Sequence, residues 1–205
     1  MGILVSCIMP TRGRREMARE ALGCFLAQTY SPRELVIVDD IQDPSFDASV
    51  CTVPGVRWMP LIGHKTIGAK RNIACDQAKG DIVAHWDSDD LSAPRRLTDQ
   101  VARLIESGLD VSGYNEVEFT GADGRWIYRN PTWAVGSSLV YWRSFWHVNR
   151  FQSLMVGEDN AFIAHTSVAN APSRGLLVAR LHDGQTNRTA EKIGQNDNNL
   201  WTKVA

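Results

Sequence analysis

The sequence has no excess of either charge. Its 22 Lys and Arg residues are matched by 23 Asp and Glu residues, which gives a formal net charge of -1. A strongly basic chain would indicate nucleic acid or an anionic membrane surface as the partner, and this balance excludes such a global preference. Only local clusters of charge remain as candidates for binding phosphate groups.

Long apolar runs are also absent. The apolar stretch within residues 1–10 is too short to span a membrane, and no small-residue cleavage site follows a long apolar region, so we expect no transmembrane segment and a cytoplasmic protein. Gly2 and Ser6 fit the loose N-myristoylation pattern, with Cys7 as a second lipid site. The same residues fit a buried first strand better, and we favour the strand.

Paired cysteine spacings are missing as well. The four cysteines contain no CxxC motif, and Cys7 lies in an apolar, strand-like run. We therefore expect free thiols in a reducing compartment.

What is present indicates one α/β domain. With 205 residues and 43% hydrophobic content, the chain can bury one sizeable core, and it has no internal repeat or low-complexity linker. Extended and helical patterns alternate, which predicts a sheet with ligands at the carboxyl ends of its strands. We expect strands at 3–9, 35–39, 56–59, 82–86, 111–119, 126–129, 137–142 and 176–181, and helices at 15–28, 65–79, from Pro94 to about Gly108, and at 159–165.

The acidic segment AHWDSDD carries the strongest chemical signal. It places Asp87, Asp89 and Asp90 directly after the apolar run 82–84, where a buried strand reaches the edge of a sheet. Three carboxylates this close repel one another unless a cation offsets their charge, and oxygen ligands suit Mg²⁺ or Mn²⁺. The alternative is a solvated acidic turn that caps the helix beginning near Pro94.

Four segments follow one another along the chain: VSCIMPTRGR near the start, ELVIVDD at 34–40, GAKRNIACDQAKGDIVAHWDSDD at 68–90 and VGEDNAF at 156–162. In this order they resemble family 2 glycosyltransferases. The resemblance implies a GT-A fold, a Rossmann-like mixed sheet flanked by helices, formed by a single domain over residues 1–205. It also implies an inverting transfer of a sugar from a nucleotide donor, with residues 1–92 as the nucleotide-sugar-binding half and 93–205 as the acceptor-binding and catalytic half.

The resemblance assigns the nucleotide-binding residues. Pro10, Thr11 and Arg12 match the loop that meets the nucleotide after the first strand. Asp40 matches the base-recognition position, where a carboxylate can accept from a pyrimidine N–H, which favours a UDP-sugar. Arg71 matches a position that contacts the nucleotide or diphosphate. Lys70 is a weaker candidate because Lys residues on such helices are usually solvated.

The resemblance also assigns the metal ligands. Asp90 is expected to coordinate Mn²⁺ or Mg²⁺ directly, Asp89 to contact ribose or metal, and Asp87 to contribute indirectly. His182 matches a downstream histidine that approaches the metal or diphosphate, and an imidazole ligand would favour Mn²⁺. A surface turn is the alternative for His182.

The base of the reaction is expected in the segment VGEDNAF. Asp159 matches the family base, which removes the acceptor hydroxyl proton, and Glu158 is its competitor. Both carboxylates could instead interact with the positive end of a helix that begins there. Trp133 is a candidate acceptor contact, because an aromatic face can stack on a sugar.

Other functions remain open at this point. A module that binds a nucleotide sugar without turnover is one alternative, although Asp90, Asp159 and His182 together argue against it. A modified DNA base as acceptor is another, with Arg12, Arg14, Arg15, Arg95 and Arg96 as phosphate contacts. The sequence leaves the acceptor (a glycan, a small molecule or DNA) and the oligomeric state undetermined.

Overall fold

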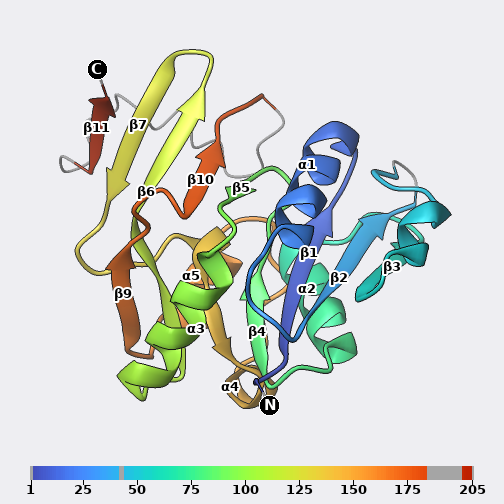
Figure 1. The fold of residues 1–205 in the computed structure, drawn as a ribbon, viewed down its shortest axis with the longest axis horizontal. Helices are drawn as coiled ribbons and strands as arrows, with labels where there is room; N and C mark the ends of the chain where they lie inside the picture. The colour runs from blue at the N-terminus through green and yellow to red at the C-terminus, as the bar shows by residue number, and fades with distance from the viewer. Residues whose placement is uncertain (1, 42–43, 184–199, 205) are drawn as a thin grey trace.

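A mixed β-sheet runs through the whole molecule (Figure 1). The structure is a computed structural model, and it describes residues 2–41, 44–183 and 200–204. The strands follow the order β11-β7-β6-β8-β4-β1-β2-β3, and β10 and β9 pair with β6 off this path. Their bounds are β1 Val5–Thr11, β2 Arg33–Asp40, β3 Val56–Leu61, β4 Ile82–His85, β5 Leu91–Ser92, β6 Val111–Gly121, β7 Gly124–Arg129, β8 Val140–Trp142, β9 Val168–Pro172, β10 Leu177–Arg180 and β11 Trp201–Val204.

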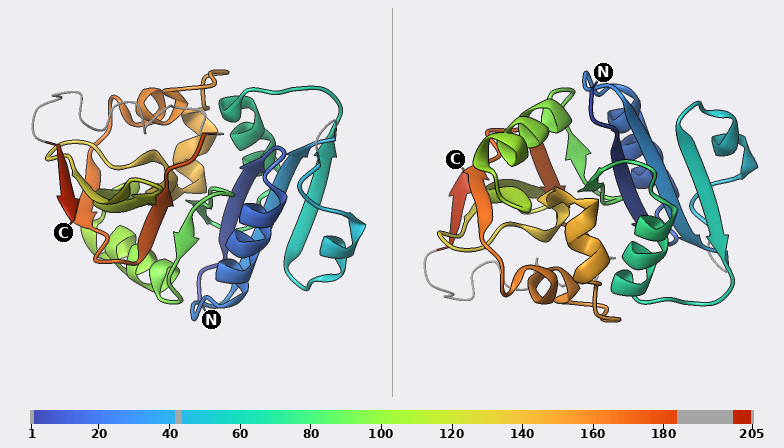
Figure 2. Two further views of the ribbon diagram at one scale, coloured as in Figure 1. Left: turned by 90° about the horizontal axis from the view of Figure 1, so that it is seen from above. Right: turned by 90° about the horizontal axis from the view of Figure 1, so that it is seen from below.

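Helices cover both faces of the sheet. The α-helices are α1 Arg15–Leu26, α2 Ile67–Gln77, α3 Arg96–Ser107, α4 Arg143–Val148 and α5 Glu158–Ile163, and the 3₁₀-helices are η1 Ala48–Thr52 and η2 Gly136–Ser138. The views from above and below show α1 and α2 on opposite faces of the parallel strands (Figure 2). Strands β1, β2 and β4 are therefore buried on both faces, which explains their largely apolar sequence.

Alternate residues of β1 belong to two different cores. Cys7 and Met9 pack with α1 and α3, whereas Ile8 packs with α2, α4 and α5. This division follows from the two-residue period of a strand. Strands β1, β2, β3 and β4 pair in parallel, so their carboxyl ends meet at one edge of the sheet.

Strand β6 connects the parallel strands to the second half of the chain. Its first residues pair with β8, which in turn pairs antiparallel to β4, and its later residues pair with β7 and β10. Strand β5 pairs with β10, so the chain that follows β4 is held against the second half. One sheet thus brings the ends of β1, β2 and β4 close to residues from far along the chain.

Most of the predicted elements are present, with several corrections. The strand expected at 137–142 is a 3₁₀ turn followed by the short β8, because the carbonyls of residues 136–138 accept from the side chains of His85, Arg96 and Gln100 instead of from a neighbouring strand. Strands β5, β9 and β11 and helix α4 were not predicted. The buried first strand, favoured over a lipid site at Cys7, is present: Cys7 is fully buried in β1. All four cysteines are free thiols, as expected.

Candidate functional site

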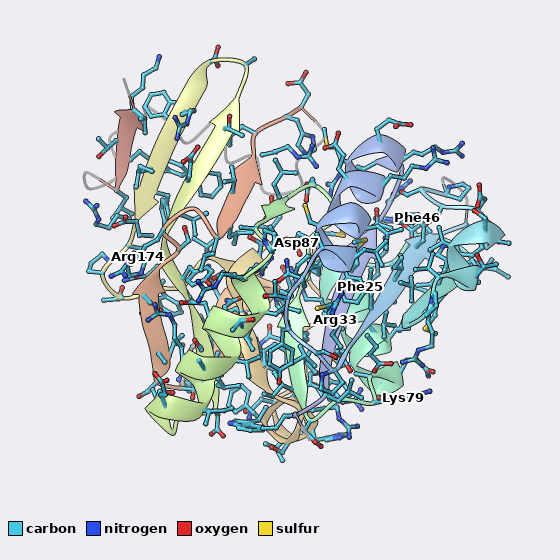
Figure 3. All side chains as sticks on the ribbon, in the orientation of Figure 1. Phe25, Arg33, Phe46, Lys79, Asp87 and Arg174 are labelled. Atoms are coloured by element: carbon cyan, nitrogen blue, oxygen red, sulfur yellow. The ribbon has the colours of Figure 1, made fainter. Side chains whose placement is uncertain are left out.

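A polar cavity of about 230 Å³ lies at the carboxyl ends of the parallel strands. It brings together seven of the residues predicted for the site: Pro10, Arg71, Asp87, Asp89, Asp90, Glu158 and Asp159. Figure 3 shows Asp87 near the middle of the molecule, between α1 and β10 in that view. Residues 10–90 and residues 158–159 come from opposite ends of the chain, so only the fold places them in one cavity.

The acidic segment emerges from β4 and turns into β5. Asp89 and Asp90 are both buried, and Asp90 Oδ1 accepts a hydrogen bond from the backbone N–H of Arg180 in β10 at 3.3 Å. Burial raises the pKa of Asp90 well above its usual value, and the charges of Asp89 and Asp87 raise it further. Since Asp89 and Asp90 are buried and share one cavity with Asp87, the alternative of a solvated acidic turn is wrong.

Asp89 is held by two cationic or ionisable groups. Its Oδ2 lies 2.9 Å from Arg14 Nη1 and 3.0 Å from His182 Nε2. Its pKa is lowered, because the hydrogen bond from His182 and the charge of Arg14 outweigh the opposing effect of burial. His182 is thus a partner of the acidic segment rather than an isolated surface turn.

The donor set partly fits a divalent cation. Neighbouring ligands of an octahedral ion, at about 2.1 Å from the metal, are about 3 Å apart, and the atoms Asp89 Oδ2 and His182 Nε2 have such a spacing. However, within residues 2–41, 44–183 and 200–204, no group of three or more His, Cys, Asp or Glu side chains is arranged to hold a metal ion. The described residues alone therefore bring fewer than three such side chains together.

Arg71 connects the acidic segment to the proposed base region. Its Nε donates to Glu158 Oε1 at 3.2 Å and its Nη2 to Asp87 Oδ1 at 3.3 Å. Arg71 is 3% exposed and lines the cavity. Its Nη1 is buried and has no hydrogen-bond partner in the described part of the chain, so this guanidinium retains an unused donor for an anion.

Glu158 and Asp159 occupy different environments. Glu158 is buried in its ion pair with Arg71, and burial raises its pKa. Asp159 is half-buried and lines the cavity, its Oδ1 accepts from the N–H of Asn160 at 2.8 Å, and its Oδ2 lies against Gly136. The structure therefore leaves the Asp159 carboxylate open to the cavity while Arg71 holds that of Glu158.

A second cluster surrounds Asp40 at the end of β2. Asp40 Oδ2 lies 3.0 Å from Lys70 Nζ, 3.0 Å from His64 Nδ1 and 3.7 Å from Arg12 Nε. Lys70 also donates to the carbonyl of Thr11 at 2.8 Å. The expectation that Lys70 is solvated is wrong: the side chain is buried, because it reaches back under β1 and β2 to these oxygen atoms.

Two carboxylate oxygens at this end of β2 have no partner. Asp40 Oδ1 and Asp39 Oδ1 are both buried without a hydrogen bond to any described residue. Asp39 Oδ2 accepts from the backbone N–H of Ser45 at 2.8 Å, which ties the end of β2 to the loop that follows it. The side chains of Arg12 and His64 are about half exposed and lie between Asp40 and the solvent.

Sequence reasoning missed some residues of these clusters. His64 lies outside all four family-like segments, and Gly136 and Ser137 fall at a position where the sequence predicts a strand. Trp133 is 39% exposed and is not among the residues that line the cavity, although Val135, two residues later, is. The only sequence signal for the turn at residues 136–138 is the run of small residues Gly-Ser-Ser itself.

Two of the five arginines proposed to contact DNA serve the protein itself. Arg96 is 1% exposed, and Arg14 is paired with Asp89 inside the site, whereas Arg12, Arg15 and Arg95 are exposed. A buried guanidinium cannot contact the phosphates of a duplex, so Arg96 gives no support to a DNA acceptor.

The parallel strands, the acidic segment at their carboxyl ends and the mixed extension through β8 and β6 define a GT-A fold. The sequence model described as Glycosyl transferase family 2 matches residues 6–168, and the chain belongs to this family. Both the predicted fold and the predicted family are therefore confirmed.

Individual relatives agree with this placement. The chain is 29% identical over 108 residues to the UDP-Glc:alpha-D-GlcNAc-diphosphoundecaprenol beta-1,3-glucosyltransferase WfgD of Escherichia coli, covering 52% of this chain and 43% of the relative. It is 32% identical over 107 residues to the succinoglycan biosynthesis protein ExoO of Rhizobium meliloti, covering 51% and 30%. The chain thus spans less than half the length of these two relatives.

Solved structures share the fold. S. aureus TarS 1-349 in complex with UDP-GlcNAc superimposes with a TM-score of 0.68 at 19% identity, covering 90% of this chain and 60% of that one. No helix among the described residues is both long enough and apolar enough to cross a membrane.

Proposed function

We propose that this chain is a metal-dependent, inverting glycosyltransferase that moves a sugar from a UDP-sugar to an acceptor hydroxyl. One observation carries the proposal: a carboxylate open to the cavity, Asp159, shares that cavity with the acidic segment Asp87, Asp89 and Asp90. An inverting transfer needs a base on one side of the sugar and stabilisation of the departing diphosphate on the other.

The nucleotide end of the proposal rests on the Asp40 cluster. Asp40 Oδ1 is an acceptor without a partner among the described residues, and a pyrimidine N–H is the donor that a carboxylate oxygen would accept. Access requires Arg12 and His64 to move, and both are about half exposed. The UDP-GlcNAc of the TarS complex and the UDP-glucose in the name of the E. coli relative support a uridine nucleotide.

The diphosphate would lie between Arg71 and the acidic segment. Arg71 Nη1 supplies a buried donor without a partner in the described chain, and Arg14 adds a second positive charge beside Asp89. Asp89, Asp90 and His182 are the residues that would hold Mn²⁺ or Mg²⁺, with diphosphate oxygens completing the shell. Such a cation stabilises the negative charge that grows on the leaving group.

The chemical step then uses Asp159. Its carboxylate takes the proton from the acceptor hydroxyl, the oxygen forms a bond to the anomeric carbon, and the bond from that carbon to the diphosphate oxygen breaks. Glu158 orients Arg71 and takes no proton, since its carboxylate is already ion-paired. Trp133 is the proposed acceptor contact. Its side chain is exposed, and it lies two residues before Val135, which lines the cavity. The unbonded cysteines fit a reaction in the cytoplasm.

A pair of matched variants tests this proposal. A panel of nucleotide sugars with Mn²⁺ first identifies the substrate by hydrolysis and thermal stabilisation. Asp159→Asn keeps the side-chain size but removes the acceptor of the proton, so transfer should fall by about two orders of magnitude while UDP still binds. Glu158→Gln should be milder. If Asp159→Asn keeps near-normal transfer while Glu158→Gln does not, the base is Glu158. If both variants keep near-normal transfer, the mechanism is refuted.

A further inference from the structure

A three-residue turn lies between the proposed base and the acidic segment. In this turn, η2, Gly136 faces Asp159: a Cβ atom added to Gly136 would fall 1.7 Å from Asp159 Oδ2. The next residue, Ser137, lines the same cavity as Asp90 and Asp159. The turn therefore lies against the proposed base and borders the cavity that the acidic segment also lines.

Buried side chains hold every carbonyl of the turn. The three donors are almost completely inaccessible to solvent; one is in β4 and two are in α3. The bonds are His85 Nδ1 to Gly136 O at 2.7 Å, Arg96 Nη2 to Ser137 O at 2.7 Å, and Gln100 Nε2 to Ser138 O at 2.5 Å. Ser137 and Ser138 are buried, and the strand β8 that follows the turn lies between β6 and β4, so buried side chains take the place of solvent as donors to these carbonyls.

Arg96 is an unusual donor for this purpose. It contacts the carbonyls of Ser137 and His85 and the side chains of Ser92 and Gln100, and it lies over the ring of Trp86. None of the ion pairs found among the described residues involves it. Four hydrogen bonds and the Trp86 ring therefore hold the buried guanidinium in one orientation, and its bond to Ser137 O holds the turn.

His85 is the donor nearest to the base. The ring is fully buried, and burial lowers its pKa well below 6.5, so it is neutral. Because the Gly136 carbonyl can only accept, Nδ1 carries the proton, and Nε2 is left to accept from Tyr141 Oη at 3.3 Å. The hydrogen bond from Tyr141 therefore orients the His85 ring, and the ring in turn holds the Gly136 carbonyl.

We infer that His85 is a positioning residue that acts through Gly136 to hold the Asp159 carboxylate where it can take the acceptor proton. The absence of a side chain at Gly136 leaves the space that Asp159 Oδ2 fills, and the bond from His85 keeps the Gly136 backbone against it. This inference rests on the proposed function, since it takes Asp159 as the base.

Two substitutions of His85 separate its two hydrogen bonds. The amide nitrogen of Asn lies near the position of Nδ1, whereas the longer Gln side chain places its amide near Nε2. His85→Asn should keep the bond to Gly136 and keep kcat within about threefold of wild type. His85→Gln should lose that bond and lower kcat by about tenfold to a hundredfold, the cost of a misplaced catalytic group. The Kd for UDP and the KM for the UDP-sugar should stay unchanged in both.

A double-mutant cycle tests the connection to Asp159 directly. Gly136→Ala should lower kcat strongly in the wild-type background but add little to Asp159→Asn, because both changes act on the same group. Gly23→Ala is the matched control, since an added Cβ at this exposed position of α1 meets no atom within 4 Å.

The outcomes distinguish this inference from the proposed function. Near-normal transfer by Asp159→Asn alone refutes the base itself, whatever the His85 variants do. If Asp159→Asn is inactive but His85→Gln folds, binds UDP and turns over normally, the positioning role is wrong. If His85→Gln does not fold, the cycle decides: equal losses from Gly136→Ala in both backgrounds overturn the inference, and a loss seen only with Asp159 present supports it.

Discussion

Lys70 Nζ lies 3.0 Å from Asp40 Oδ2, and both side chains are almost completely buried beneath the strand ends that form the nucleotide half of the site. Burial lowers the pKa of Lys70, and the hydrogen bond to Asp40 opposes that shift. The pair therefore places two charges inside the protein, where each depends on the other.

Removal of Lys70 should therefore destabilise the fold. Lys70→Met removes the buried cation beside Asp40 and leaves only the half-exposed Arg12 and His64 next to its carboxylate. The free energy of unfolding should fall by about 3 kcal/mol, measured by urea denaturation. Lys70→Met with Asp40→Asn should recover part of the loss. Lys79→Met, at an exposed position just after α2, is the control. Equal stability of Lys70→Met and the control would show that the ion pair contributes nothing.

The burial of Lys70 could not be predicted from the sequence, whereas the strands and the acidic segment could. The parallel strands and the acidic segment were predicted because their signals are local: apolar runs of strand length, followed by carboxylates. Whether a Lys on a helix is solvated depends on which residues the fold packs against that helix. For Lys70 these are Thr11 at the end of β1 and Asp40 at the end of β2.

The same dependence on the fold explains the rest of the site. Glu158 and Asp159 are neighbours in a motif, so the sequence could not separate their roles; the fold does, by placing Arg71 beside Glu158 and Gly136 beside Asp159. Strands β9 and β11 were missed because each is short and lacks a clean alternation, and the sheet partners β6 and β7 determine their conformation.

Arg71 should not tolerate replacement by Lys. The guanidinium bonds Asp87 and Glu158 at once and retains Nη1 for an anion, whereas an ammonium group cannot span the same three directions. Arg71→Lys should weaken UDP binding by about tenfold or more, the loss of one charge-assisted hydrogen bond. Calorimetric titration with UDP measures this. Arg150→Lys is the control: this arginine is exposed and forms an ion pair with Asp76 outside the cavity, so the variant should bind UDP normally.

Metal dependence should require Asp90. If this carboxylate helps to hold the cation against the diphosphate, Asp90→Ala should abolish the increase in UDP affinity that Mn²⁺ gives wild type. The fold should remain, because Asp90 accepts only one backbone hydrogen bond at 3.3 Å within the described chain. Calorimetry with and without Mn²⁺ tests this, and an unchanged metal effect in the variant would remove Asp90 from the proposed ligands.

Glu158 should reduce the stability of the fold at neutral pH. Its folded pKa is raised above 4.5, first by burial, although the charge of Arg71 acts in the opposite direction. The folded state therefore binds the Glu158 proton more tightly than the unfolded state does, and this contribution to stability, present below pH 4.5, is lost as pH rises through the raised pKa. Glu158→Gln cannot ionise and should be more stable than wild type at pH 8, with the difference shrinking as pH falls toward 4.5. Urea unfolding across this range measures the difference, with Glu106→Gln on the exposed side of α3 as control. A variant less stable than wild type at pH 8 would mean that the ion pair with Arg71 outweighs the cost of burying the carboxylate.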